Sequence, residues 1–218
     1  MTAKRKAPGK QTNCGFTLVE LIIVIVLLGM LAAVGSSMLS DSFKTTLIVN
    51  AGNASEGQAR YVLERIAREI REVKSCHGSA CLTGSAATFD GYCITAMTAS
   101  QLAFYKRDAS SASAADTSAC ATGSVNRIIN YDGSSTVRLQ SALTSSGSDP
   151  VLTSSVAPSG FSLSYLQADG STLDLGAPSA TLATYNTLVQ FVRITLTVKD
   201  TVSGQAISQR LTVGLRNS

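Results

Sequence analysis

The chain has 218 residues, of which 44% are hydrophobic and only 15% charged, and it contains no Trp. Abundant Ser, Thr, Ala and Gly favour a β-rich domain with many turns over a compact helical enzyme. The formal net charge of +4 is located at the N-terminus. Four of the 18 Lys and Arg residues lie within the first ten positions, and the remaining 14 balance the 14 Asp and Glu residues. The rest of the chain is formally neutral, and no basic patch in the sequence argues for a nucleic-acid partner.

An apolar run follows the basic start, from Phe16 to about Leu39. It is long enough to span a bilayer, and the positive-inside rule places the chain's start in the cytoplasm and everything after about residue 40 across the membrane. Glu20 interrupts the run, at a cost of about 2.5–3.5 kcal/mol for a charge at the centre of a membrane helix. A removable signal peptide or a plain signal anchor has similar basic and apolar parts, but neither gives Glu20 a role.

Residues 40–75 are predicted to continue the helix. Gly52 and Gly57 each cost about 1 kcal/mol in a helix interior, which favours a break or bend near them. Beyond them, apolar residues recur at helical spacing and predict a buried stripe made of Val62, Leu63, Ile66, Ala67, Ile70 and Val73. The opposite side is expected to be a solvated face with the pairs Arg60–Glu64, Glu64–Arg68 and Arg68–Glu72.

Alternating apolar and polar residues after Lys74 predict an antiparallel sheet. The expected strands are 102–107, 124–131, 136–140 and 161–167. "LVQFVRITLTVKD" and "QAISQRLTVGLRNS", joined by the turn "TVSG", predict a C-terminal hairpin. Its apolar face should bury against the helix stripe, which gives an α+β fold. Segments 76–87, 108–124 and 141–160 have the small polar composition of loops.

Four cysteines follow the apolar run, namely Cys76, Cys81, Cys93 and Cys120. An even count in an exported domain indicates two disulfides. Four cysteines permit three pairings, and proximity favours Cys76 with Cys81 and Cys93 with Cys120. A metal site through Cys76, His77 and Cys81 matches no standard zinc spacing.

Motifs for catalysis or for cofactors are missing from the sequence. There is one histidine, and the Walker, G-x-S-x-G and H-E-x-x-H patterns do not occur. "NYDGSS" and "ADGSTLD" resemble calcium-loop fragments but do not complete the ligand pattern. We therefore expect neither an enzyme nor a bound cofactor or metal.

The stretch "GFTLVELIIVIVLLGMLAAV", which starts at Gly15, resembles the N-terminal signature of type IV pilins and of type II secretion pseudopilins. The resemblance implies that a prepilin peptidase cuts between Gly15 and Phe16 and methylates the new amine. It also implies that Glu20 pairs with an amine of its own chain or of a neighbouring subunit during assembly.

The resemblance also implies a domain organisation. A long N-terminal helix, with a membrane half and a periplasmic half, would pack on an antiparallel β-sheet head in an α+β fold. The expected segments are a cytoplasmic leader at 1–15 that is removed, a transmembrane and assembly helix at 16–39, a periplasmic amphipathic helix at 40–75 and a β-rich head at 76–218.

Three features indicate a minor pilin that is assembled into a type IV pilus or primes its assembly. They are the size of the mature chain, its loop-rich head and the lack of a cysteine pair near the C-terminus. The layout and the closing "LTVGLRNS" resemble larger minor subunits: the W-type protein of type IV pili, the J-type pseudopilin of type II secretion and the O-type protein of mannose-sensitive haemagglutinin pili. The alternatives are a type II secretion minor pseudopilin and a membrane-anchored periplasmic adhesion or binding protein that never polymerises.

The same resemblance implies partners and a location. The expected partners are the prepilin peptidase, other pilin or pseudopilin subunits and the inner-membrane assembly platform. The protein is expected in the bacterial inner membrane as a single-pass protein with its C-terminal head in the periplasm. It would then move into a pilus or pseudopilus, at the tip.

Overall fold

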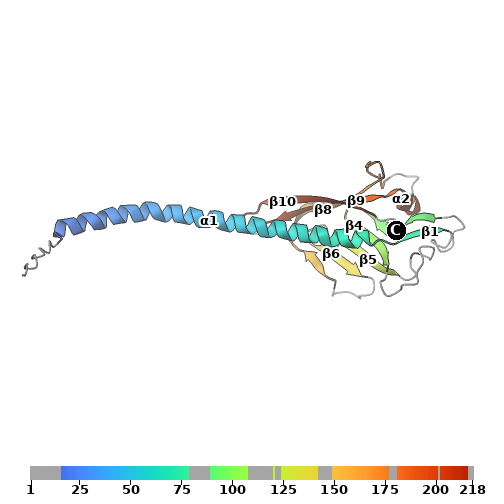
Figure 1. The fold of residues 1–218 in the computed structure, drawn as a ribbon, viewed down its shortest axis with the longest axis horizontal. Helices are drawn as coiled ribbons and strands as arrows, with labels where there is room; N and C mark the ends of the chain where they lie inside the picture. The colour runs from blue at the N-terminus through green and yellow to red at the C-terminus, as the bar shows by residue number, and fades with distance from the viewer. Residues whose placement is uncertain are drawn as a thin grey trace, which may run out of the picture. The chain divides into compact units, whose positions relative to one another are not determined.

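The computed structural model describes residues 16–78, 89–107, 120, 124–141, 149–176, 181–200 and 202–215. The elements in chain order are α1 (Leu18–Arg71), β1 (Ser75–Gly78), β2 (Phe89–Tyr92), β3 (Ile94–Met97), β4 (Gln101–Arg107), β5 (Ser124–Tyr131), β6 (Val137–Ser141), β7 (Val151–Thr153), β8 (Val156–Leu166), α2 (Leu182–Leu188), β9 (Phe191–Lys199) and β10 (Ala206–Gly214). A long helix followed by antiparallel sheets confirms the α+β class and the pilin-like layout (Figure 1).

The chain divides into two compact units, one that ends at Leu47 and one that begins at Ile48. α1 runs through both units as one helix of 54 residues. The break expected near Gly52 and Gly57 is therefore wrong. Each glycine costs about 1 kcal/mol, but a helix of this length, with Ala51, Ala54 and Ala59 around the two glycines, continues through them. A Cβ at either position would meet nothing within 4 Å.

Besides the end of α1 and the short α2, the second unit contains two sheets and a β1–β2 ribbon. The larger sheet has the order β3-β4-β5-β6-β7, and the smaller one has the order β10-β9-β8. The strands predicted at 102–107, 124–131 and 136–140 correspond to β4, β5 and β6, and 161–167 corresponds to the second half of β8. The C-terminal hairpin is confirmed as β9 and β10, in which Ile194 lies opposite Leu211.

The loop predicted at 141–160 is wrong in its second half, because it contains β7 and the start of β8. β7 has only three residues, and β8 is interrupted by a register shift between Val156 and Phe161. Neither stretch shows enough alternation to indicate a strand. The first predicted loop likewise begins within β1. Residues 79–88 and most of 108–124 lie outside the described residues.

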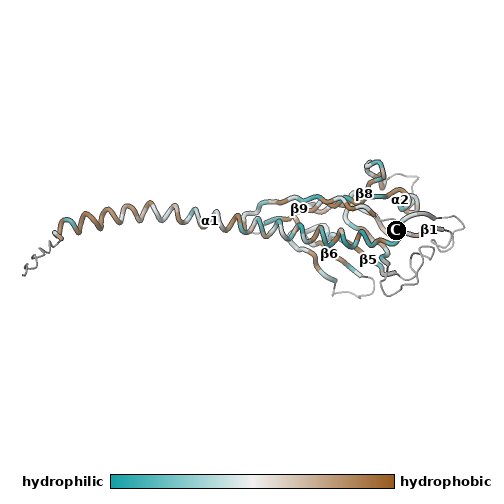
Figure 2. Tube along the Cα trace, in the orientation of Figure 1, coloured by the Kyte–Doolittle hydropathy of each residue, from teal (hydrophilic) through white to brown (hydrophobic). Residues whose placement is uncertain are grey.

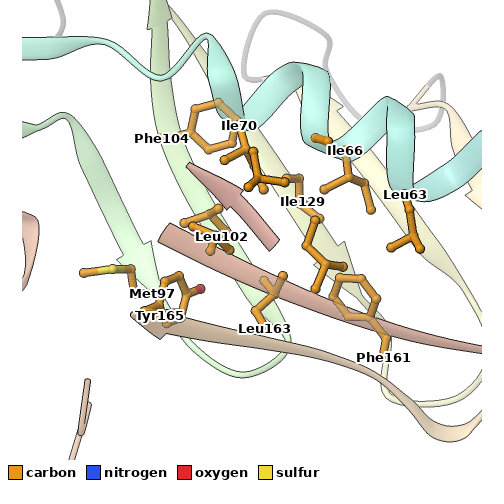
Figure 3. Packing of buried hydrophobic residues seen from close by; sticks show 14 of the residues in the cluster. Leu63, Ile66, Ile70, Met97, Leu102, Phe104, Ile129, Phe161, Leu163 and Tyr165 are labelled. Atoms are coloured by element: carbon orange, nitrogen blue, oxygen red, sulfur yellow. The ribbon is translucent and has the colours of Figure 1, made fainter. Parts of the chain in front are cut away.

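The core of the second unit lies between α1 and the two sheets. Leu63, Ile66 and Ile70 extend from α1 toward side chains of β4, β5 and β8, among them Phe104 and Ile129 (Figure 3). All six residues of the predicted stripe are buried. The spacing of apolar residues in the helix therefore identified the face that packs.

The hairpin contributes unequally to this core. The inward residues of β9 (Val192, Ile194, Leu196 and Val198) are completely buried, whereas β10 is an edge strand in which only Val213 is buried. The Tyr165 hydroxyl of β8 donates hydrogen bonds to the carbonyls of Thr98 and Gln101 at 2.9 and 3.1 Å. These hydrogen bonds connect the smaller sheet to the turn between β3 and β4. Because the Tyr165 side chain is buried, the pKa of its hydroxyl is raised well above its usual value.

Candidate assembly site

The start of α1 is fixed by its own first residues. The Thr17 hydroxyl accepts a hydrogen bond from the backbone N–H of Glu20 at 3.3 Å, and the Thr17 carbonyl accepts one from the N–H of Leu21 at 3.2 Å. Thr17 is thus the N-cap, and Glu20 occupies the third helical position, as in a capping box. T-x-x-E before an apolar run is the sequence signal of this cap, although the role of Thr17 was not among the predictions.

Glu20 is the only charged residue in a long apolar surface. No other charge occurs until Asp41, so residues 21–40 are all uncharged. A carboxylate in the first helical turn is favoured by the partial positive charge of the helix N-terminus. Among the described residues, no ion pair involves Glu20. Its position therefore suits a cation that comes from another chain or from a newly formed chain terminus.

The apolar side chains around Glu20 have no partner in the structure. They are exposed throughout the first unit, from Phe16 at 77% to Leu47 at 61%. Figure 2 shows that the residues along this part of α1 are mostly hydrophobic. The uncharged residues 21–40 form about 30 Å of helix, which matches the hydrocarbon thickness of a bilayer. By length and composition, α1 is the one helix in the described part of the chain that is able to cross a membrane.

Two hydroxyl groups in the same stretch are satisfied within the helix. Ser36 and Ser37 donate hydrogen bonds to the carbonyls of Ala33 and Val34 at 3.0 and 2.9 Å. Because an unpaired hydroxyl is costly in hydrocarbon, these bonds let the helix face lipid or another apolar helix. Glu20 is the residue in this stretch that still requires an outside partner.

The second unit contains a buried ion cluster that the sequence analysis did not identify. Glu69 is 2% exposed. Its carboxylate lies 2.8 Å from the Arg65 guanidinium, 3.3 Å from Lys106 Nζ and 3.7 Å from Arg127 Nε. Lys106 also pairs with Glu72. A buried carboxylate is tolerated when it is paired and hydrogen-bonded, and this cluster ties α1 to β4 and β5.

The ion pairs expected on α1 are wrong in their partners. Arg60 pairs with Glu56, at 2.6 Å, rather than with Glu64, and Glu72 pairs with Lys106 rather than with Arg68. Glu72 finds its partner in the sheet because β4 places Lys106 beside the helix, whereas Arg60 pairs one turn back along the helix instead of one turn forward. The predicted solvated face is nevertheless confirmed, because Arg60, Glu64, Arg68 and Glu72 are all exposed, whereas the packed flank carries Arg65 and Glu69.

One disulfide is defined by the described residues, and it joins Cys93 to Cys120 across a Cα–Cα distance of 5.4 Å. This is the pairing that proximity favoured. Cys76 is also disulfide-bonded, while Cys81, its expected partner, lies outside the described residues. Cys76 and Cys93 are buried together and pack against Tyr105.

The two calcium-like fragments are turns stabilised by their own aspartates. The Asp132 carboxylate accepts hydrogen bonds from the backbone N–H groups of Thr136, Ser134 and Ser135, which hold the pKa of that carboxyl well below its usual value. Asp169 accepts from the N–H and the hydroxyl of Ser171. No cluster of three or more His, Cys, Asp or Glu side chains suited to a metal occurs within the described ranges.

Comparison with protein families gives one match. Residues 10–36 match the family described as the prokaryotic N-terminal methylation motif. The match includes Gly15, which lies outside the described residues, together with Phe16, Glu20 and the first part of α1. It does not reach the second unit. No curated protein matches the chain.

Proposed function

The methylation motif is the signature of type IV pilins and pseudopilins, and we propose that this protein is a minor pilin-like structural subunit that is assembled into a type IV pilus or primes its assembly. The observation that carries the proposal is the exposed apolar helix with a single carboxylate, Glu20, in its capped first turn. A surface of this kind needs lipid before assembly and other apolar helices afterwards.

Processing would supply the missing partner of Glu20. Hydrolysis of the peptide bond between Gly15 and Phe16 leaves a carboxylate on Gly15 and an amine on Phe16. The amine stays cationic after one methylation, and in its own chain it lies about one helical turn from Glu20. An amine on a neighbouring subunit offers the same charge. Because an unpaired charge in hydrocarbon is heavily penalised, this pairing selects a specific stagger between helices.

The β-rich second unit would then form the head of the subunit. In this proposal the leader at 1–15 is removed in the cytoplasm, 16–39 anchors the subunit in the inner membrane, 40–75 continues as the periplasmic helix and 76–218 is the periplasmic head. The partners are the prepilin peptidase, the assembly platform and other subunits, and the final position is the filament tip. The proposed role is structural rather than enzymatic.

Mass spectrometry of the mature N-terminus tests the processing step. The proposal expects a chain that begins at Phe16 with one added methyl group. In a Gly15→Leu variant, which alters the residue at the cut, the leader should stay attached. An intact leader on the wild-type protein, or a cut near Gly35, would instead identify an anchor or a signal peptide.

Filament incorporation tests the role of Glu20. A Glu20→Ala variant should be processed and inserted in the membrane but be lost from the sheared filament fraction. Asp41→Ala is the matched control, because Asp41 is an exposed carboxylate of the same helix and pairs with Lys44. Equal incorporation of both variants contradicts the proposal. A wild-type protein that is processed but never polymerises supports the adhesion alternative, and rescue of secretion without pili identifies a pseudopilin.

A further inference from the structure

The outer face of the smaller sheet has an unusual composition. Register across the three strands places Ser164, Arg193 and Thr212 in one row, and Ser162, Thr195 and Arg210 in the next. Thr197 lies opposite Ser208, and Lys199 lies opposite Ala206. Because directly opposed residues project from the same side of a sheet, these side chains form one surface, called here the hydroxyl–arginine face.

This face points away from the core. Its β9 residues alternate with Val192, Ile194, Leu196 and Val198, which are all completely buried. Arg210 and Lys199 are exposed, and Arg193 is partly exposed. Six of its side chains carry a hydroxyl group, namely Ser162, Ser164, Thr195, Thr197, Ser208 and Thr212. None of these side chains is acidic, and the one aromatic residue that projects from the same side of β9 is Phe191, which lies at the start of the strand beside Gly214 of β10.

The three cations of the face are not neutralised within the described part of the protein. No ion pair there involves Arg193, Lys199 or Arg210, whereas Lys106 and Arg127 of the larger sheet both pair with Glu69. The carboxylate next to Lys199 in the chain, Asp200, is 2% exposed. It accepts hydrogen bonds from the N–H groups of Val202 and Ser203 in the β9–β10 turn.

The two arginines are also close to each other. Arg193 is opposite Thr212 and Arg210 is opposite Thr195, so the arginines are diagonal neighbours on adjacent strands. Diagonal pairs lie about 7–8 Å apart, and like charges at such range repel. An anion bound across both arginines removes this repulsion. The proximity of the two arginines cannot be read from the sequence, because it depends on the register between β9 and β10.

We propose that the hydroxyl–arginine face is a docking surface for an acidic polysaccharide, of the polyuronate or sulfated class. Guanidinium groups bind carboxylate and sulfate groups through paired hydrogen bonds. The Ser and Thr hydroxyls between them match the hydroxyls of a sugar chain as donors and acceptors. A single-stranded nucleic acid would use several aromatic side chains on which successive bases stack, whereas this side of the three described strands has Phe191 alone, at its end. The inference rests on the second unit alone and does not depend on pilin assembly.

Binding of the full-length chain in neutral detergent to immobilised polygalacturonate tests the proposal, with neutral dextran as the reference polymer. Arg193→Gln combined with Arg210→Gln should weaken binding at least tenfold and reduce its dependence on salt. Arg138→Gln is the matched control, since Arg138 is a partly exposed arginine of β6 in the other sheet. That variant should bind within about twofold of the wild type.

Thermal unfolding of each variant separates binding from folding. If the double variant loses stability, Arg210→Gln alone, at an exposed position, should still weaken binding several-fold. Unchanged binding in the arginine variants, or equal binding to dextran, would overturn the proposal. Binding to single-stranded DNA that is as tight as binding to polygalacturonate would also overturn it, because the face would then recognise charge and not a sugar chain. Self-association of the wild type that the double variant abolishes would assign the face to a second copy of the chain instead.

Discussion

The two parts of α1 differ in where their apolar side chains find a partner. In the second unit Ile66 and Ile70 are completely buried against strands of the same chain, whereas in the first unit Ile22 and Leu28 are 47% and 58% exposed. Both stretches are apolar and both are helical. The difference shows that the apolar side chains of one stretch have a partner inside the chain, whereas those of the other stretch need a partner outside it. The exposed apolar side chains of the first unit therefore mark the surface that lipid or other subunits must cover.

Removing the central carboxylate of the buried ion cluster should give the largest loss of stability in the second unit. Glu69→Ala leaves the cations of Arg65, Lys106 and Arg127 around an emptied site, and losing one partner of a buried pair costs about 3–5 kcal/mol. Urea unfolding of the second unit, followed by tyrosine fluorescence, measures the change. Glu56→Ala removes only the exposed partner of Arg60 and should cost less than about 1 kcal/mol; equal losses would show that Glu69 does not hold the helix.

Truncation of apolar side chains compares the two parts of α1 directly. Ile66→Ala creates a cavity in the core and should lower the free energy of unfolding by about 2–5 kcal/mol. Leu28→Ala removes an exposed side chain and should leave the unfolding of the second unit unchanged. The same urea titration reports both values. A matching loss from Leu28→Ala would mean that the exposed helix is required for folding of the head.

Removal of the Thr17 cap should have a smaller effect on stability, limited to the start of α1 in the first unit. Thr17→Ala deletes the hydroxyl that accepts the Glu20 N–H, and loss of an N-cap costs about 0.5–2 kcal/mol. We expect faster amide hydrogen exchange at residues 18–21 in detergent and no change in the second unit. Thr45→Ala is the control, because that hydroxyl bonds to the Asp41 carbonyl in the middle of the helix. Unchanged exchange in Thr17→Ala would exclude the capping role.

The weakest expected effect concerns a turn of the larger sheet. The folded-state pKa of Asp132 lies below its unfolded value because three backbone N–H groups bind the carboxylate. Its contribution to stability is therefore present above about pH 4 and is lost as the pH falls through the folded-state pKa. Asp132→Asn should flatten the pH dependence of the urea midpoint in this acidic range. If Asp132→Asn leaves the pH dependence of the urea midpoint unchanged, other carboxylates cause that dependence.

Local periodicity accounts for the parts of the fold that the sequence predicted. The stripe around Ile66 and the alternation in 124–131 and 191–199 each depend on residues within one element, so their spacing reveals the buried face. Phe16 and Glu20 were likewise recognisable in one short motif. α2 was missed because it has only seven residues and depends on a single cap, the Thr181 hydroxyl bound to the N–H of Thr184 at 3.4 Å.

Contacts between distant elements account for what the sequence did not predict. Glu69 resembles a member of a solvated charged face until Lys106, 37 residues away, is placed beside it. The hydroxyl–arginine face depends in the same way on the register between β9 and β10. Periodicity shows which way a side chain points from its own element, but it does not show which strand will be the neighbour.

The order of synthesis gives the buried stripe of α1 a further consequence. β9, whose side chains complete its core, begins at Phe191, 120 residues after α1 ends at Arg71. At about 5–20 residues per second, the stripe waits roughly 6–24 s for that strand to be made. During this interval β4, β5 and β8 are made one after another, so the stripe gains its partners in steps and is fully covered only once β9 exists. Until then, the part of the stripe that β9 covers is an exposed apolar surface, and such a surface is prone to aggregation before any filament exists.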